Sequence, residues 1–373
     1  MKTLLRIAFA LVLTAALTEA GIRIYRSAIG QPPPHPDPSV AEEWEWAQDH
    51  LEAGAPSIGS QARPDPLLGW RASPRRRAAV GGPKRVGRAR TPGIPRVVLV
   101  GDSFTRELGA LRERFEGSRT FQPGWEVVNL AVQGFGVGQA WLRYREDGVG
   151  YRGDVAILGF YLRDYFRTFR SFRSFAKPTF ALVDGELRVE HVPVPTPEAL
   201  YEAYRSGERR IGRPGRSWVL DFVRQQREAL NRRSDLRGEQ FAVFTAILES
   251  FRDEALRGGA CPALVIFPTR PEDYYGTVYE ELDLRARDAA HELGMPWLAL
   301  AEPLYRGVAP ADRERFFGRG SGAHMSDYGR HEVDRALDAA FERYHPDACF
   351  AAAPDGSLWG ANAPEDSRAG SAG

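Results

Sequence analysis

Two residues of the sequence have the chemistry of a nucleophile and its base, Ser103 and His324. Ser103 follows the apolar run Val97–Val100 in "PRVVLVGDSFTREL". A serine at a turn from a strand into a helix either caps the helix or presents a nucleophile at the end of the sheet. His324 lies in "GSGAHMSDYG", before the last helical segment, and His331 is the alternative base. Because a serine hydroxyl needs a base to accept its proton, we expect Ser103 and His324 to act together.

The segments around these residues alternate between strand and helix patterns from Arg96 onward. This alternation predicts an α/β protein whose parallel sheet carries helices on both faces. Ligands bind beyond the carboxyl ends of such strands, where Ser103, Gly134 and Arg163-Asp164 fall. The five predicted strands are "RVVLVGD", "WEVVNLAV", "GDVAILGFY", "ALVIFP" and "PWLALAE".

An insertion over about residues 166–237 interrupts this pattern. "FALVDGELRVEHVPVP" predicts a hairpin about Asp184-Gly185, and helical segments follow near 217–233 and 239–257. The stretch "FRTFRSFRSF", which contains Arg167, opens the insertion. It is either an amphipathic entry segment or a cationic, aromatic wall for an acidic or sugar-containing ligand.

The N-terminal residues 1–26 combine Lys2 and Arg6 with an apolar run that ends at Leu17. This pattern predicts a signal peptide or an N-terminal membrane anchor, and hence an exported protein of the cell envelope or periplasm, either anchored or secreted. Residues 27–94 are expected to be a Pro/Arg-rich linker and N-terminal arm with a short helix in "AEEWEWAQDHLEAG". The main domain is predicted over 95–346 and a disordered tail over 347–373.

Composition limits the partners and cofactors of the 373-residue chain. Its net charge of +1 gives no reason to expect nucleic acid binding. No metal-ligand spacing, dinucleotide fingerprint or Walker loop occurs, so neither a metal nor a cofactor is predicted. Cys261 and Cys349 either form a disulfide or remain free thiols.

Taken in order, the motifs resemble those of the SGNH (GDSL-type) hydrolases, in their exported, membrane-anchored bacterial branch. "VLVGDSFT" resembles block I, "NLAVQGFGVGQ" block II, "DVAILGFYLRDYFR" the region of block III and "HMSDYG" the histidine part of block V. "LLGWR" also resembles that branch, and the resemblance covers about residues 65–345. It implies a doubly wound, flavodoxin-like parallel sheet of five strands, with Ser103 as nucleophile and His324 as base. It also implies that the backbone N–H groups of Ser103 and Gly134 bind the oxyanion.

Two positions depart from the family pattern. Arg163 stands where block III has an asparagine, and Ser321 stands where block V has an aspartate. Arg163 either donates to the oxyanion or pairs with Asp164. Loss of the orienting aspartate is costly, but a backbone carbonyl can do part of its work, so the sequence leaves both a Ser-His dyad and a silent site open. The other residues expected to support the site or bind substrate are Asp102, Asp164, Arg167 and Ser321.

The resemblance implies a serine esterase or O-acyltransferase. The expected substrate is an ester, first of all an O-acetyl group, on envelope polysaccharide or on a lipid. Two alternatives remain open. One is a catalytically silent SGNH-fold protein that binds a glycan, and the other is an envelope assembly factor that works through its basic linker and insertion.

Overall fold

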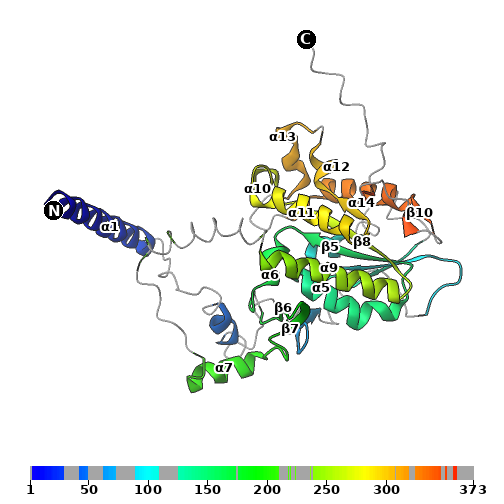
Figure 1. Cartoon of the computed structure of the whole chain (residues 1–373), viewed down its shortest axis with the longest axis horizontal. Helices are drawn as coiled ribbons and strands as arrows, with labels where there is room; N and C mark the ends of the chain where they lie inside the picture. Colours follow the sequence, from blue (N-terminus) through cyan, green and yellow to red (C-terminus); the bar gives the residue numbers. More distant parts are fainter. Residues whose placement is uncertain are drawn as a thin grey trace, which may run out of the picture. The chain divides into compact units, whose positions relative to one another are not determined.

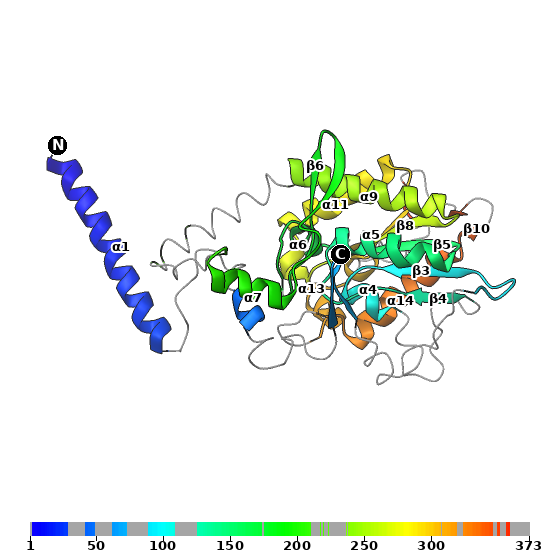
Figure 2. The ribbon, with the colours of Figure 1, turned by 90° about the horizontal axis from the view of Figure 1, so that it is seen from below.

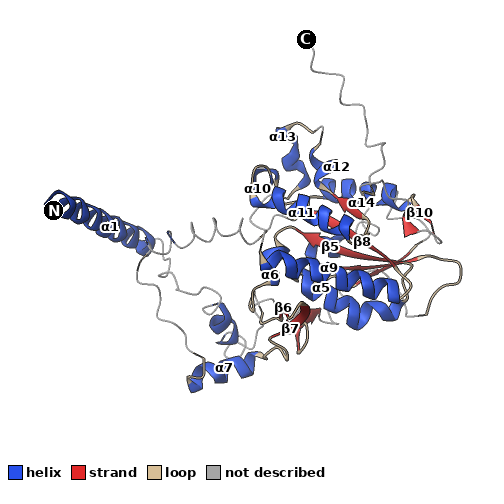
Figure 3. Ribbon diagram, in the orientation of Figure 1, coloured by secondary structure: helices blue, strands red, loops and turns tan. Residues whose placement is uncertain are grey.

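A central sheet of five parallel strands places the ends of the predicted strands along one edge (Figures 1 and 3). The strand order β4-β3-β5-β8-β9 confirms the predicted flavodoxin-like, doubly wound topology. β3, β5 and β8 are buried at every position, which explains why their sequences are apolar apart from Arg96 at the start of β3. The strands are β3 Arg96–Val100, β4 Glu126–Asn129, β5 Val155–Tyr161, β8 Cys261–Phe267 and β9 Trp297–Ala299.

The computed structural model describes most of the chain outside the arm, the insertion and the tail. The described residues are 2–28, 42–48, 62–72, 89–108, 125–173, 175–209, 217, 219, 223, 236, 238–306, 308–318, 324–345, 349–350 and 356–358.

Helices cover both faces of the sheet, as right-handed crossovers between parallel strands require. Figure 2 shows α9 and α11 on one side of the sheet and α4 and α14 on the other. The helix predicted to run on from Ser103 ends at Glu107, and residues 109–124 lie outside the described residues. The helical elements are α4 Ser103–Glu107, α5 Val137–Arg143, η3 Tyr144–Gly148, η4 Val149–Tyr151, α6 Asp164–Thr168, α9 Glu239–Arg257, α10 Pro271–Tyr274, α11 Val278–Glu292, α12 Ala301–Tyr305, α13 Pro310–Arg313, η5 Glu314–Phe316 and α14 Asp327–Phe341.

Two of the three two-stranded antiparallel pairs in the described residues precede β8 in the sequence. The predicted hairpin forms from β6 (Thr179–Val183) and β7 (Glu186–Glu190), with Asp184 and Gly185 in the left-handed conformations that its two-residue turn needs. The second hairpin, β1 (Ala62–Asp65) and β2 (Gly69–Ala72), lies within the stretch that the sequence assigns to the linker and arm. It buries Leu68 and Trp70, so this part of the arm packs as ordered structure.

The described chain divides into two compact units. One unit comprises Ser60–Arg170, Lys177–Val194 and Glu239–Gly373 and contains the sheet. The other comprises Met1–Gly59, Ser171–Ala176 and Pro195–Gly238, and includes α1 (Lys2–Ala28) and α7 (Pro197–Ser206). The predicted insertion is therefore divided, because its hairpin belongs to the sheet unit and α7 to the other. Its helix predicted near 217–233 lies largely outside the described residues.

The smaller unit packs the predicted short helix, observed over 42–48, against parts of the insertion. Trp46 contacts the rings of Phe172 and Phe175 edge-on, at centroid distances of 5.7 and 5.4 Å. Buried Glu43 accepts a hydrogen bond from the Tyr204 hydroxyl at 2.8 Å. Two of the four phenylalanines of "FRTFRSFRSF" thus serve as core side chains.

The prediction that the whole tail is disordered is wrong for two short pieces. β11 (Cys349–Phe350) pairs with β10 (Tyr344–His345), and Ser357 forms a bridge beside Trp297 of β9. Leu358 donates its backbone N–H to Trp297 O at 2.8 Å and is buried. Ser357 and Leu358 cover part of β9, the edge strand of the sheet, whose backbone groups would otherwise be unpaired there.

Cys261 at the start of β8 and Cys349 of β11 form a disulfide across 88 residues of sequence. Because the bond closes a long loop in the unfolded chain, we expect Cys349→Ser to lower the free energy of unfolding by about 2–4 kcal/mol. Urea titration of the detergent-solubilised chain measures this. A reductant should bring the wild type to the same midpoint and leave the variant unchanged. Equal midpoints for oxidised wild type and variant would contradict the prediction.

Candidate active site

The turn from β3 into α4 fixes the position of Ser103. Asp102 caps α4, and its carboxylate accepts the backbone N–H of Phe104 at 2.8 Å. A Cβ at Gly101 would lie 2.1 Å from the Thr105 hydroxyl oxygen, and one at Gly159 of β5 would lie 1.8 Å from it. Only glycines at both positions allow this short helix to pack so closely on the sheet. Ser103 is thereby held at the carboxyl end of an interior strand, and it is 5% exposed.

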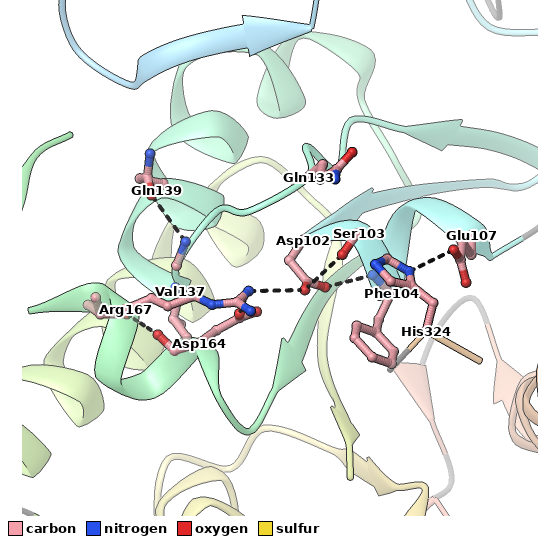
Figure 4. A network of polar contacts seen from close by, with 12 residues as sticks. Asp102, Ser103, Phe104, Glu107, Gln133, Val137, Gln139, Asp164, Arg167 and His324 are labelled. Carbon is pink, nitrogen blue, oxygen red and sulfur yellow. Dashed lines mark hydrogen bonds and ion pairs between the residues drawn. The ribbon is translucent and has the colours of Figure 1, made fainter. Parts of the chain in front are cut away.

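His324 reaches the same helix from the other end of the domain sequence (Figure 4). Its ring stacks on Phe104, the residue after Ser103, with a centroid distance of 5.3 Å and an interplanar angle of 9°. Its Nδ1 lies 2.9 Å from Oε1 of Glu107. The structure therefore brings the predicted base to the predicted nucleophile's helix, whereas the alternative base His331 is exposed on α14.

Glu107 is the residue of this site that sequence reasoning missed. It lies four residues after Ser103, and residues so spaced on a helix share a face. The spacing from Ser103 could have marked Glu107 as a site residue. It could not have shown that Glu107 contacts His324, which is 217 residues away in the sequence. Ser321, where the family aspartate would stand, lies outside the described residues.

The electrostatics of His324 follow from these contacts. The hydrogen bond with the Glu107 carboxylate raises the pKa of His324, while burial of the ring lowers it. The charges of Glu107 and Asp102 add to the increase, and Arg106 opposes it. The net effect is a raised pKa, so the imidazole binds a proton more readily than a free histidine does.

The loop after β4 runs beside the nucleophile turn. Leu130 N–H donates to Leu99 O at 2.8 Å, and Val132 N–H donates to Gly101 O at 3.0 Å. Gly134 follows in a left-handed conformation, with φ of 81°. Trp70 of "LLGWR" supports this loop, since its Nε1 donates to Gln133 O at 3.3 Å.

The start of α4 bears on the expected oxyanion site. The Asp102 carboxylate takes the backbone N–H groups of Phe104 and Thr105. The N–H of Ser103 begins the helix, where no partner exists within the helix itself. Donation by Ser103 and Gly134 to an oxyanion remains a prediction.

Arg163 does not pair with Asp164, one of the two alternatives drawn from the sequence. Its guanidinium instead forms an ion pair with Asp273 of α10 and lies 5.7 Å from the ring centre of Tyr279. Its side chain is 41% exposed. The family asparagine is therefore replaced by a residue held toward α10, and its role as an oxyanion donor stays a prediction.

Asp164 and Arg167 instead form a buried charge network with Asp102 (Figure 4). Arg167 Nη1 lies 2.5 Å from Asp164 Oδ1 and 3.6 Å from Asp102 Oδ2. Burial raises the pKa of Asp102, and the Arg167 charge opposes that increase. The Ser103 hydroxyl lies 3.4 Å from Asp102 Oδ2, so this network borders Ser103 directly.

Asn129 has a structural position. Its side-chain amide donates to the carbonyls of Thr105 and Leu108 at 2.9 and 3.2 Å and so holds the end of α4. Among the described residues, no group of three or more His, Cys, Asp or Glu side chains is placed to hold a metal ion.

The strand order, the serine after β3 and the histidine before α14 together reproduce the arrangement that the motif order implies. The chain has a flavodoxin-like, doubly wound α/β fold, which is the fold that the resemblance to the SGNH hydrolases implies. No protein-family model matches the sequence. No curated protein matches it significantly.

Solved structures with some similarity to this chain include a GDSL-like lipase from Bacteroides thetaiotaomicron. Its sequence identity is 12% and its TM-score is 0.38, and the match covers 72% of this chain and 96% of that one. A lipase/acylhydrolase from Enterococcus faecalis has 14% identity and a TM-score of 0.36 over 67% and 96%. An acetyl-xylooligosaccharide esterase from Geobacillus Stearmophilus has 15% identity and a TM-score of 0.35 over 66% and 92%. At these values the similarities carry no information about substrate.

Arg167 offers a direct test of the buried network. Arg167→Met leaves the carboxylates of Asp102 and Asp164 buried without this counter-ion, so we expect the free energy of unfolding to fall by about 3–5 kcal/mol. The matched control is Arg188→Met, since Arg188 pairs with Glu186 on the exposed β6–β7 hairpin. That loss should change stability by less than about 0.5 kcal/mol. Equal effects in urea titration would show that the network contributes nothing.

Proposed function

We propose that the chain is an exported serine esterase or O-acyltransferase that acts on ester groups, first of all O-acetyl groups, of envelope polysaccharide or lipid. The observation that carries the proposal is the placement of His324. Its ring stacks on the residue after Ser103, and a carboxylate accepts at its Nδ1. A carboxylate on Nδ1 is the contact that orients a histidine base in a serine triad, and this supports the proposal.

In this mechanism the Ser103 hydroxyl oxygen attacks the ester carbonyl carbon while His324 Nε2 accepts its proton. The tetrahedral oxyanion is bound by the backbone N–H groups of Ser103 and Gly134. The C–O bond to the alcohol then breaks, and the imidazolium gives its proton to the departing oxygen. The products of this half-reaction are the free alcohol and an acyl ester on Ser103.

The second half-reaction repeats the chemistry with a new nucleophile. A water molecule, or the hydroxyl of a sugar acceptor, attacks the acyl-Ser103 carbonyl while His324 takes its proton. Breaking the acyl–Oγ bond returns the proton to Ser103 and releases a free acid or a transferred ester. Because the base must be neutral, the raised pKa of His324 means that activity rises only as pH passes through that raised value.

Support for export comes from α1 and from the disulfide. Residues Arg6–Tyr25 form a 20-residue helical stretch of mean hydropathy 1.7, long enough to cross a bilayer. Glu19 and Arg23 are one helical turn apart and pair at 2.7 Å, so these two of the three charges in the stretch offset each other, and Arg6 lies at its end. The disulfide fits an oxidising compartment.

Covalent labelling with a fluorophosphonate probe tests the chemistry. We expect the wild type to label on serine, and Ser103→Ala and His324→Ala to reduce labelling to background. His331→Ala is the matched control, since this exposed histidine should be dispensable. Wild-type labelling no stronger than that of Ser103→Ala would reject the esterase and favour the silent, glycan-binding alternative.

Retention of α1 as an anchor is a separate prediction. With Glu19 and Arg23 paired inside the helix, we expect the full-length chain to stay in the membrane pellet after alkaline carbonate extraction, at its uncleaved mass. A tag at the C-terminus and mass spectrometry of the N-terminus provide the measurement. Recovery of a shortened, extractable chain would show that the segment is a cleaved signal peptide.

A further inference from the structure

We propose that Glu107 is the positioning residue of His324, so that the acid of the triad comes from the nucleophile's own helix. The inference rests on the proposed function, in which His324 is the base for Ser103. Nothing in the motif order assigns Glu107 a role, because the family acid precedes the histidine by three residues, at the position of Ser321.

Two contacts together fix the imidazole. The 2.9 Å contact between His324 Nδ1 and Glu107 Oε1 places the ring proton on Nδ1, because a carboxylate only accepts. The nearly parallel stack on Phe104 sets the plane of the ring. Phe104 is itself stacked on Tyr161 of β5 at 4.0 Å, which holds this platform against the sheet. Nε2, at the opposite edge of the ring, is then left without a proton and able to accept one.

The second carboxylate oxygen of Glu107 is also held. Arg330 of α14 donates from Nη1 to Glu107 Oε2 at 3.3 Å. Arg330 also pairs with Asp327, at the start of α14. The Glu107 side chain is 21% exposed.

The other acids near the site are engaged elsewhere. Asp102 caps α4 and faces Arg167, so it acts on His324 through space only. Asp327 is 59% exposed and contacts Arg330, and the structure shows no contact between it and His324. Arg106 is the cation that opposes protonation of His324. Of the acids described around the ring, Glu107 therefore has the direct contact.

The experiment compares Glu107→Gln with Asp327→Asn in the full-length chain in detergent. Asp327→Asn also removes a negative charge that pairs with Arg330, but Asp327 does not contact His324. It is therefore the matched control. We expect Glu107→Gln to slow fluorophosphonate labelling on the order of a hundred- to ten-thousandfold, as loss of the orienting acid allows the wrong tautomer. The control should stay within about twofold of the wild type.

A second readout does not depend on activity. NMR titration of 15N-labelled histidine, assigned through His324→Ala, gives the pKa and tautomer of His324. Glu107→Gln should lower that pKa, because a negative charge is lost. Arg330→Gln should raise it, because a cation beside Glu107 is lost. Opposite shifts would show that Glu107 acts on His324 through its charge, and loss of the Nδ1–H tautomer in Glu107→Gln would show that it also fixes the ring proton.

The outcomes separate the two proposals. Shifts in the same direction, or no shift with Glu107→Gln, would overturn the positioning role whatever the activity. Labelling of Glu107→Gln at the wild-type rate, with Ser103→Ala unlabelled, would overturn it and leave the esterase intact. If the wild type does not label but the opposite shifts are seen, the esterase fails and the positioning of His324 by Glu107 stands.

Discussion

The close packing of α4 on β5 is the constraint on which the rest of the site depends. Thr105 occupies space that a side chain at position 101 or 159 would fill, so the helix lies against the sheet at its first turn. In five residues, α4 then presents Ser103, the Phe104 platform and Glu107. Because these share one rigid turn and a half of backbone, their relative positions are set by helical geometry alone. His324 reaches this helix from a distant part of the sequence.

The short helix α4 also places a charged group in the protein interior beside Ser103. Capping so short a helix places the Asp102 carboxylate in the interior, where an unpaired charge is unfavourable. Arg167 and Asp164 extend the burial to three charged groups and make it tolerable. The residues of "FRTFRSFRSF" have different roles. Arg167 lies beside the buried Asp102, while Phe172 and Phe175 pack against Trp46. This one stretch therefore contributes buried side chains to both compact units of the chain.

The sequence was sufficient where the governing interaction is local. Apolar runs predicted the five strands, and Asp184-Gly185 predicted the β6–β7 turn, because burial and φ preference act over a few residues. Contacts between distant residues could not be read in this way. The Arg163–Asp273 pair spans 110 residues, and the Ser357 bridge to β9 comes from a tail of disordered composition. The disulfide was left open for the same reason, because two cysteines alone do not specify their separation in space.

The location of the acid extends this point to the chemistry. An imidazole is oriented by any carboxylate that reaches Nδ1, and the position of that carboxylate in the sequence is immaterial. A helix places residues four apart about 6 Å along one face, so an acid after the nucleophile can meet a histidine that faces the nucleophile. Absence of an acid at position 321 is therefore no evidence that the site is inactive. The loop before His324 has a serine at that position, and the Glu107–His324 contact is the reason to propose that the helix after β3 supplies the acid.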